Sequence, residues 1–401
     1  MTNIGFFMVI PFLTFYLTEH KGMTGFQIGL LFAILQFTRR VLGVLAGWLS
    51  DRFGAAPILS AGLALEAVAY LWFTSAGRSF LAWVAAFALL GFGGAMNNNG
   101  SRSLIAAGRA ANSAVNLSRY YVSINAAGLV GPLIGSALLT AGLSVAGFEV
   151  AAGLHVVFAV VSAVLLHGMA APDASNVRLS NMVLALRDHH LVAYCGLAVG
   201  GWFLISQYRI ALPLTIVHQG LPGGWLGPLT AVNAVVCMIA VSVIGKRIAK
   251  RGTIARLDVL SASGVVLGAG WLLCAFGGVG PLVAAVVVTS LGESLFCGII
   301  DAIIVTFAPP GGVGLYLGYS AMAWGIGGML AGFTGGLFYL AAQHGELILF
   351  WAALALVGVA TSAGIWLARG YFADAIAQRE VIDAPPEPPA DAREAPQPTR
   401  R

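Results

Sequence analysis

The chain has 401 residues, of which 59% are hydrophobic and only 9% are charged. Soluble domains carry about 25% charged residues, so this composition excludes an ordinary water-soluble fold and, for most of the chain, disorder. The 21 basic and 16 acidic residues leave a net charge of +5. No basic cluster is interleaved with aromatic residues in a polar segment, so this excess does not predict a nucleic-acid partner.

Twelve apolar runs follow one another along the chain, each near the roughly 20 residues that a membrane-crossing helix needs. Short breaks with charged or turn residues separate them, as at 51–54 and 309–312. We therefore predict an all-α polytopic membrane protein with about 12 transmembrane helices. The first run opens almost at Met1, which suggests that the first helix is clipped or that the start codon is assigned late. The runs cover residues 2–18, 26–50, 57–76, 80–105, 119–141, 150–168, 191–216, 225–245, 258–277, 281–307, 314–340 and 347–368.

The chain also contains an internal repeat. Small residues in Ala127–Ser136 coincide with those in Gly327–Gly336 at an offset of 200 residues, close to half the chain. Transporters are often built from such repeats, with a binding site near the midplane between them. We therefore predict two pseudo-symmetric six-helix bundles, 1–168 and 191–370, joined by a cytoplasmic linker at 169–190. The alternative is coincidence, because 52 glycines make small-residue matches easy.

The basic residues of the loops predict the orientation in the membrane. If the N-terminus faces inside, twelve arginines and lysines fall on that side and only Lys21 and Arg78 on the other. Basic loops stay in the cytoplasm, so both chain ends are expected there. The tail, 371–401, is interrupted by prolines and charges, cannot build a core, and is expected to be disordered.

Soluble-type enzyme and metal sites are absent from the sequence. Four cysteines lie far apart in apolar runs, and no spacing typical of a zinc site or a disulfide framework is present. The sequence also lacks HExxH, GxSxG and Walker motifs. We expect no metal, no cofactor and no enzymatic activity.

The loop after the second span resembles the signature loop of the major facilitator superfamily, through Gly47-Trp-Leu-Ser-Asp51-Arg52-Phe-Gly54. The fifth span carries Gly131-Pro132-x-x-Gly135-Ser136, which resembles a motif of the drug:proton antiporters in that superfamily. Residues 51–57 and 91–103 most resemble the multidrug-resistance exporters of the MdtH type. The resemblance covers about 1–370 and implies the major facilitator fold. The two basic positions that close the family's loop are Ala55 and Ala56 here.

The resemblance implies a conformational latch. Asp51 ends the second span, and the eleventh begins near 312–315 on the same side, where a helix N-terminus carries about half a positive charge. The alternative is a solvated loop acid. Glycines in the fifth span let helices approach closely, and Pro132 invites a bend. The residues assigned to the latch and its gating are Gly47, Asp51, Arg52, Gly54, Gly131, Pro132 and Gly135.

Ionisable residues inside the spans are more informative, because each is costly unless it is paired or wet. Arg40 and Glu66 lie at matching depths, about 16 and 14 Å from the cytoplasmic breaks at a helical rise of about 1.5 Å per residue. We predict that Glu66 pairs with Arg39 or Arg40, and that the other arginine faces the central cavity; the alternative is that both are locked in structural pairs. Buried carboxylates can hold and release a proton near neutral pH. The proton-coupling candidates are Glu293, Asp301 and Glu66.

Polar and aromatic residues within the spans predict the wall of a substrate cavity. Three consecutive asparagines at 97–99 cannot all face lipid cheaply. Arg209 has no acid near it in sequence, which makes it a candidate for binding an anionic group. His155 and the pair His189-His190 are expected to be structural or solvated. The cavity candidates are Arg39, Arg40, Asn97, Asn98, Asn125, Trp202, Gln207, Arg209 and Trp324.

Together these features predict a secondary active transporter of a bacterial inner membrane, working by alternating access. The resemblance implies proton-coupled efflux of small amphipathic molecules or drugs. The alternatives are a dedicated exporter of an anionic metabolite such as a siderophore, an uptake symporter and, from another class, a channel. The expected partners are a small-molecule substrate, protons and membrane lipid, and the protein is expected to be a monomer.

Overall fold

The structure is a computed structural model that describes residues 2–106, 110–167, 187–249, 251–308 and 313–382. Within these ranges every regular element is a helix, so the all-α prediction is confirmed. The predicted linker 169–190 falls mostly outside the described residues.

Six helical segments make up the first half. The first two are interrupted, by a 3₁₀ turn that contains Pro11 and by a π-helical turn that contains Arg39 and Arg40. The elements in chain order are α1 (Thr2–Val9), η1 (Ile10–Phe12), α2 (Leu13–Lys21), α3 (Gly25–Gln36), η2 (Phe37–Val41), α4 (Gly43–Phe53), α5 (Ala55–Ser75), α6 (Phe80–Ala106), α7 (Ala110–Thr140) and α8 (Ser144–Leu165).

The second half follows the same plan. Its first segment is interrupted by a 3₁₀ turn that contains Arg209, and its second ends in a π-helical turn. The elements are α10 (His189–Ser206), η3 (Gln207–Arg209), α11 (Ala211–His218), η4 (Gly223–Trp225), α12 (Leu226–Ala240), η5 (Val241–Gly245), α13 (Lys246–Ala249), α14 (Thr253–Leu272), η6 (Leu273–Phe276), α15 (Val279–Phe307), α16 (Val313–Gln343) and α17 (Leu347–Ile382).

Ten segments in the described ranges are long and apolar enough to cross a membrane. The other two predicted spans are also helical: Thr2–Lys21 is short and broken by η1, and α7 contains a described apolar stretch at Ala126–Thr140. Local signals explain several breaks. Thr24 forms a capping box with Gln27 at the start of α3, and Gly54 ends α4 with φ of 95°, a conformation that favours glycine.

The internal repeat occupies equivalent places in the two halves. Gly131 and Gly135 of α7 pack against α1 in their own half, where an added Cβ would meet Phe7 and Phe12. Gly327 of α16 packs in the same way against α10. Across the halves, α7 packs on α12 while α16 packs on α3. Glycine at these positions lets each pair of helix backbones approach closely.

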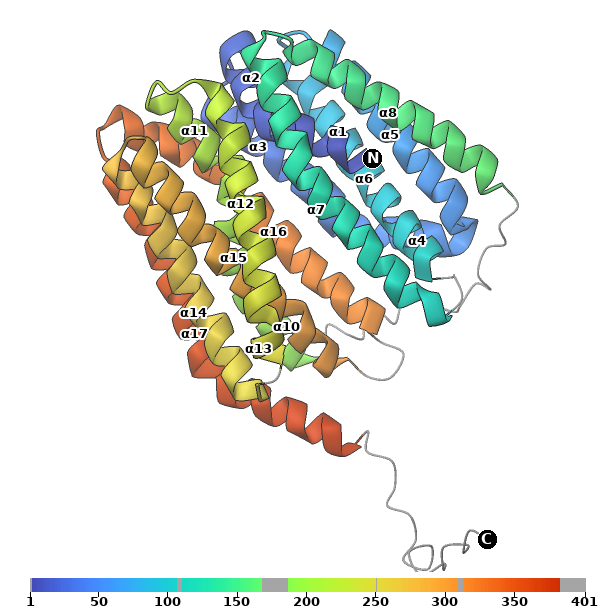
Figure 1. The fold of residues 1–401 in the computed structure, drawn as a ribbon, viewed down its shortest axis with the longest axis vertical. Helices are drawn as coiled ribbons and strands as arrows, with labels where there is room; N and C mark the ends of the chain where they lie inside the picture. Colours follow the sequence, from blue (N-terminus) through green and yellow to red (C-terminus); the bar gives the residue numbers. More distant parts are fainter. Residues whose placement is uncertain (1, 107–109, 168–186, 250, 309–312, 383–401) are drawn as a thin grey trace, which may run out of the picture.

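The two halves contact each other along only part of their length. At one end, Gly25 of α3 lies against Gly335 of α16, and Ser136 of α7 donates a hydrogen bond of 2.5 Å to Gly224 O. Further along, Gly325 of α16 lies against Arg40 of η2. Beyond that level α4 packs on α5 and α6 of its own half. In Figure 1 α7 and α12 lie close at the top and diverge toward the end where α13 lies, which we call the tail side.

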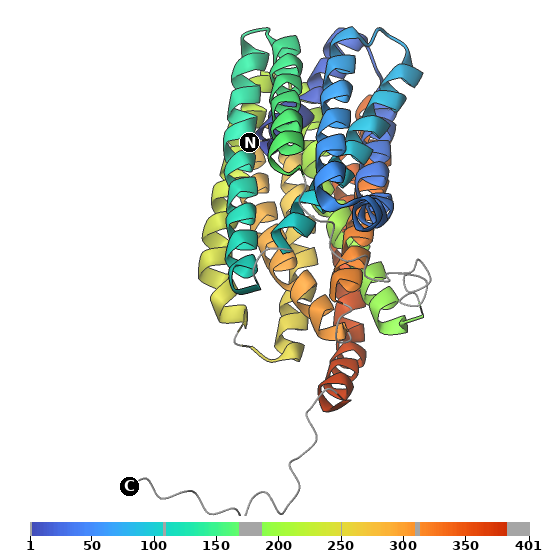
Figure 2. The same cartoon turned by 90° about the vertical axis from the view of Figure 1, so that its right-hand side faces the viewer.

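The last helix is longer than the sequence predicts. We expected disorder from residue 371, but α17 continues to Ile382 and projects past the other helices (Figure 2). The physical reason is packing: Phe372, Ala375 and Ile376 are buried at helical spacing, and Arg379 forms an ion pair with Asp188. Residues 383–401 lie outside the described part.

Candidate functional site between the two helical bundles

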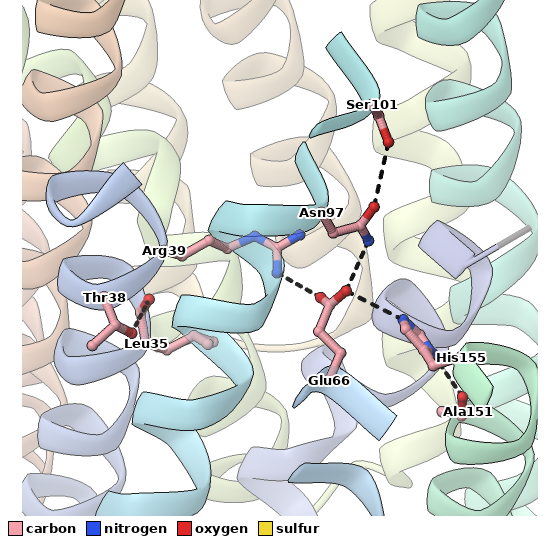
Figure 3. A network of polar contacts seen from close by, with 8 residues as sticks. All are labelled: Leu35, Thr38, Arg39, Glu66, Asn97, Ser101, Ala151 and His155. Atoms are coloured by element: carbon pink, nitrogen blue, oxygen red, sulfur yellow. Dashed lines mark hydrogen bonds and ion pairs between the residues drawn. The ribbon is translucent and has the colours of Figure 1, made fainter. Parts of the chain in front are cut away.

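A network of polar side chains surrounds Glu66 inside the first half (Figure 3). Arg39 Nη1 lies 3.2 Å from Glu66 Oε1, and the two side chains are 7% and 1% exposed. The predicted pairing of Glu66 with one of the two arginines is thus confirmed, with Arg39 as the partner. Because the pair is buried, removal of either member leaves an uncompensated charge and should destabilise the fold.

Two further side chains contact the second oxygen of this carboxylate. Asn97 Nδ2 donates a hydrogen bond of 2.8 Å to Glu66 Oε2, and His155 Nε2 lies 3.6 Å from the same atom. Ser101 continues the chain with a hydrogen bond of 3.4 Å to Asn97 Oδ1. Asn97, a predicted cavity residue, thus also supplies a hydrogen bond to Glu66. The network joins η2, α5, α6 and α8.

Arg40 points away from this network and toward the second half. Its guanidinium lies 3.4 Å from the centre of the Trp324 ring on α16, within the range of a cation–π contact. Trp324 in turn stacks on Trp202 of α10, with ring centres 4.5 Å apart. Both indole Nε1–H groups are buried and have no hydrogen-bond partner in the described part of the chain. Three predicted cavity residues therefore form one stack across the two halves.

Glu293 of α15 is the centre of a second polar cluster. Asn233 Nδ2 of α12 donates a hydrogen bond of 2.9 Å to Glu293 Oε2, and Cys237 Sγ lies 3.9 Å from the same oxygen. Arg209 lies close enough for its charge to act on Glu293. Arg209 therefore has an acidic neighbour that the sequence separation concealed.

The face of α15 that carries Glu293 continues toward the tail side. Cys297 and Asp301 follow one and two helical turns later, and both are exposed. Asp301 accepts a hydrogen bond of 2.6 Å from Ser320 of α16. Because Glu293 contacts α12 and Asp301 contacts α16, this exposed face lies between those helices, toward the other half.

The remaining predicted site residues have other surroundings. Gln207 is fully buried and accepts a hydrogen bond of 2.9 Å from Thr334, so it lies in the packing between η3 and α16 rather than on an open wall. Asn98 is half-buried. Arg52 is exposed beside Trp48 of its own helix. The side chains of Asp51 and Asn125, and residues 309–312 near the predicted latch, lie outside the described part.

A further cluster forms on the tail side around Asp188, which lies just before the membrane-crossing segment His189–His218. Arg379 of α17 forms an ion pair of 2.5 Å with Asp188 Oδ2, and Tyr316 of α16 donates a hydrogen bond of 2.6 Å to it. Burial raises the pKa of Asp188, but the hydrogen bonds from Tyr316 and the Leu191 backbone and the charge of Arg379 outweigh it. The pKa is therefore lowered from 3.8.

Sequence reasoning missed three members of these clusters. His155 was assigned a structural role, although an ionisable residue in an apolar run is itself a signal of function. Asn233 and Cys237 lie one turn apart in the eighth span, but nothing in the sequence links them to Glu293. Among the described residues no group of histidine, cysteine, aspartate and glutamate could hold a metal ion.

Comparison with known proteins identifies the class. The sequence pattern of the Major Facilitator Superfamily matches residues 1–331. The chain therefore belongs to this superfamily and is a multi-pass membrane transporter.

Within the superfamily, the chain is similar to multidrug resistance proteins. The chain is 25% identical over 371 residues to the multidrug resistance protein MdtH of Photorhabdus laumondii, covering 89% of each chain. It is 24% identical over 396 residues to the MdtH protein of Escherichia coli O1:K1, covering 95% of this chain and 94% of that one. The predicted resemblance to MdtH-type exporters is thus confirmed.

Solved structures share the fold. A nucleoside transporter, NupG, superposes with a TM-score of 0.73 at 14% identity, covering 92% of this chain and 98% of that one. A POT peptide transporter gives a TM-score of 0.71 at 14% identity, covering 93% of each chain. At this level of identity the likeness extends to the fold alone.

Proposed function

We propose that this transporter is a proton-coupled exporter of small amphipathic organic molecules, working by alternating access in a bacterial inner membrane. The observation that carries the proposal is the position of its ionisable side chains. Glu293 and Asp301 contact α12 and α16, the two helices that pack on the first half, and the backbone oxygen of Arg209 accepts a hydrogen bond from Thr14 of the first half. Such groups are costly in a membrane unless they meet water, protons or substrate.

The contacts between the halves support the alternating-access part of the proposal. The halves touch on the side opposite the tail, through α3 with α16 and α7 with α12, and diverge toward the tail side (Figure 1). A second arrangement, with the tail side closed, would expose the same ionisable groups to the other side of the membrane. The excess of basic loop residues supports a cytoplasmic position for the tail side.

The substrate class follows from charge and shape. The stack of Trp202 and Trp324 offers aromatic surface, and Glu293 offers a carboxylate to a cationic group. Glu293 interacts electrostatically with Arg209, which favours amphipathic or cationic molecules over a dedicated anionic metabolite. We propose transport without chemical conversion of the cargo, by a monomer with both chain ends in the cytoplasm.

Purified protein in lipid vesicles with an imposed pH gradient tests this proposal. Ethidium serves as the cationic probe and calcein as the anionic one. We expect ethidium to move against the proton flux, and Glu293→Gln to abolish that movement, while the exposed control Arg78→Gln leaves it unchanged. Calcein transport lost in Arg209→Ala would favour the anionic-metabolite exporter, movement with the proton flux would favour uptake, and large ohmic currents would favour a channel.

A further inference from the structure

The surroundings of His155 determine which nitrogen of its imidazole ring carries a hydrogen. The side chain is 1% exposed in α8, and its Nδ1 lies 2.7 Å from the backbone oxygen of Ala151. A carbonyl oxygen only accepts hydrogen bonds, so Nδ1 carries a hydrogen. In the neutral imidazole the other nitrogen, Nε2, then carries no hydrogen and can only accept a hydrogen bond.

Nε2 faces another acceptor. Glu66 Oε2 lies 3.6 Å away, and both side chains are buried. Two acceptors that face each other in a buried site repel, whereas one proton on either atom makes the contact attractive. With that proton the pair is an imidazolium beside a carboxylate, or a neutral imidazole beside a carboxylic acid.

We propose that Glu66 and His155 share one exchangeable proton and form a proton-binding site of the first bundle. The inference rests on the proton-coupled transport proposed above and names the side chains that hold a proton. When the proton leaves, a carboxylate and a neutral imidazole remain, and the cluster formed with Arg39 changes from one net positive charge to none.

Three further side chains surround the proposed site. Arg39 on η2 contacts the other carboxylate oxygen and stacks on Phe6 of α1, with the guanidinium 4.2 Å from the ring centre. The Tyr70 ring of α5 lies 5.1 Å from the His155 ring. The carboxylate of Glu66 thus lies between the guanidinium of Arg39 and the imidazole of His155.

A hydrogen-bonded path leads from this pair toward the tail side. Glu66 accepts a hydrogen bond from Asn97, and Asn97 accepts one from Ser101, a turn further along α6 (Figure 3). Ser101 is half-buried, so the path runs from an enclosed carboxylate to a position nearer solvent. This arrangement places polar side chains between the carboxylate and the tail side of an otherwise apolar bundle.

The pair is also connected to the contact between the halves. Arg39 lies in the π-helical turn η2, beside Arg40, which stacks on Trp324 of the second half. Single π-helical turns often mark functional sites, because they are locally strained and can rearrange. Loss of the proton strengthens the attraction of Glu66 for Arg39, and the resulting shift of η2 changes the contact between Arg40 and Trp324.

Infrared difference spectroscopy across a pH titration tests the shared proton on the full-length protein in lipid. We expect the carboxyl and imidazole bands of the wild-type protein to titrate with the same midpoint. Glu66→Gln and His155→Asn should each remove both changes, and the exposed control His189→Asn should remove neither. His155→Asn retains an amide that can donate to Ala151, and unchanged helix content by circular dichroism identifies the folded variants.

Two results would overturn the proposal: a carboxyl band assigned to Glu66 that titrates unchanged in His155→Asn, or no titration of this pair in the wild-type protein. Because this measurement needs no substrate, it separates the shared proton from the proposed function. In vesicles, we expect His155→Asn to lose ethidium efflux driven by a pH gradient but to keep gradient-independent exchange of ethidium. Full gradient-driven efflux by that variant would contradict a coupling role for the pair.

Discussion

Charged side chains inside the spans are held by specific partners, and neighbouring residues have different ones. Arg39 and Arg40 are adjacent, and adjacent residues on a helix point about 100° apart. Arg39 turns inward to Glu66, while Arg40 turns outward to Trp324 of the other half. One arginine therefore belongs to the interior of a bundle and the other to the contact between bundles.

Replacement of Arg39 tests the buried pair. We expect Arg39→Met to lower the free energy of unfolding by about 3–5 kcal/mol, because it leaves the Glu66 charge buried without its ion-pair partner. Denaturant titration in mixed micelles measures this change, with the exposed Arg78→Met as the control. The double replacement Arg39→Met with Glu66→Met should recover much of the loss, since an apolar pair leaves no uncompensated charge. Equal stability of all these variants would contradict the assignment.

Among the elements, close helix crossings and helix breaks decide how the halves meet. Gly29 of α3 and Gly332 of α16 lie backbone to backbone, so that a Cβ at either position would collide with the other's carbonyl oxygen. Only glycine, which has no Cβ, permits the two backbones to approach this closely. The contact on the side opposite the tail therefore depends on glycine at these positions.

Gly29→Ala should disfavour the arrangement in which α3 and α16 touch. We expect the population to shift toward the tail-closed arrangement, seen as slower reaction of Cys297 with a membrane-impermeant thiol reagent. Gly153→Ala in α8 is the matched control, because an added Cβ there meets nothing within 4 Å. Unchanged labelling in a folded Gly29→Ala protein would argue against this role of the crossing.

The end of α17 gives a pH-dependent prediction for an element. Because the pKa of Asp188 is below 3.8 in the folded chain, its stabilising effect is complete above pH 3.8. The effect disappears as the pH falls through the lower folded pKa, when protonation of the carboxylate weakens its pairing with Arg379.

Hydrogen exchange of residues 371–382 measures this effect. We expect protection to fall in the wild-type protein below pH 3.8, after correction for the intrinsic exchange rate. Asp188→Asn should show low protection already at neutral pH and little further change on acidification. A wild-type protein that keeps full protection down to the lowest pH at which it stays folded would show that packing of Phe372 and Ile376 suffices.

In the whole molecule, two bundles rest on each other at one end and present ionisable faces to each other further along. The cores of the bundles form within each half, where α5 packs on α6 and α8, and α14 packs on α15 and α17. The contacts between halves use fewer elements, chiefly α3 with α16 and α7 with α12. Such a division lets the halves rock against each other while each keeps its core.

Cys297 reports on this arrangement. It is exposed on the same face of α15 as Glu293 and Asp301, whereas Cys195 and Cys274 are buried. In a protein with Cys195, Cys237 and Cys274 replaced by serine, we expect Cys297 to react with an impermeant thiol reagent added from the cytoplasmic side. Cys297→Ser in the same background should abolish the reaction. Labelling from the opposite side alone would contradict the proposed orientation.

The class of protein could be predicted from the amino-acid sequence. Apolar runs of membrane-crossing length and short breaks predicted an all-α membrane protein, because hydropathy and turn chemistry are local properties. The resemblance of the motifs around Asp51 and Pro132 to those of a known family implied the major facilitator type. Matching depths in neighbouring spans also sufficed to pair Glu66 with one of two arginines. The prolines and charges after residue 370 wrongly predicted disorder for residues 371–382. The helix α17 continues to Ile382, where Arg379 pairs with Asp188, a residue far away in sequence.

The partners of the ionisable groups became clear only from the packing of the helices. Depth along a span is readable from residue number, but rotation about the helix axis at a π-helical or 3₁₀ turn is not, so Arg39, Arg40 and Arg209 were assigned to one cavity. Contacts between remote spans placed Asn233 beside Glu293 and His155 beside Glu66. These contacts depend on how whole helices pack, which no local pattern of residues records.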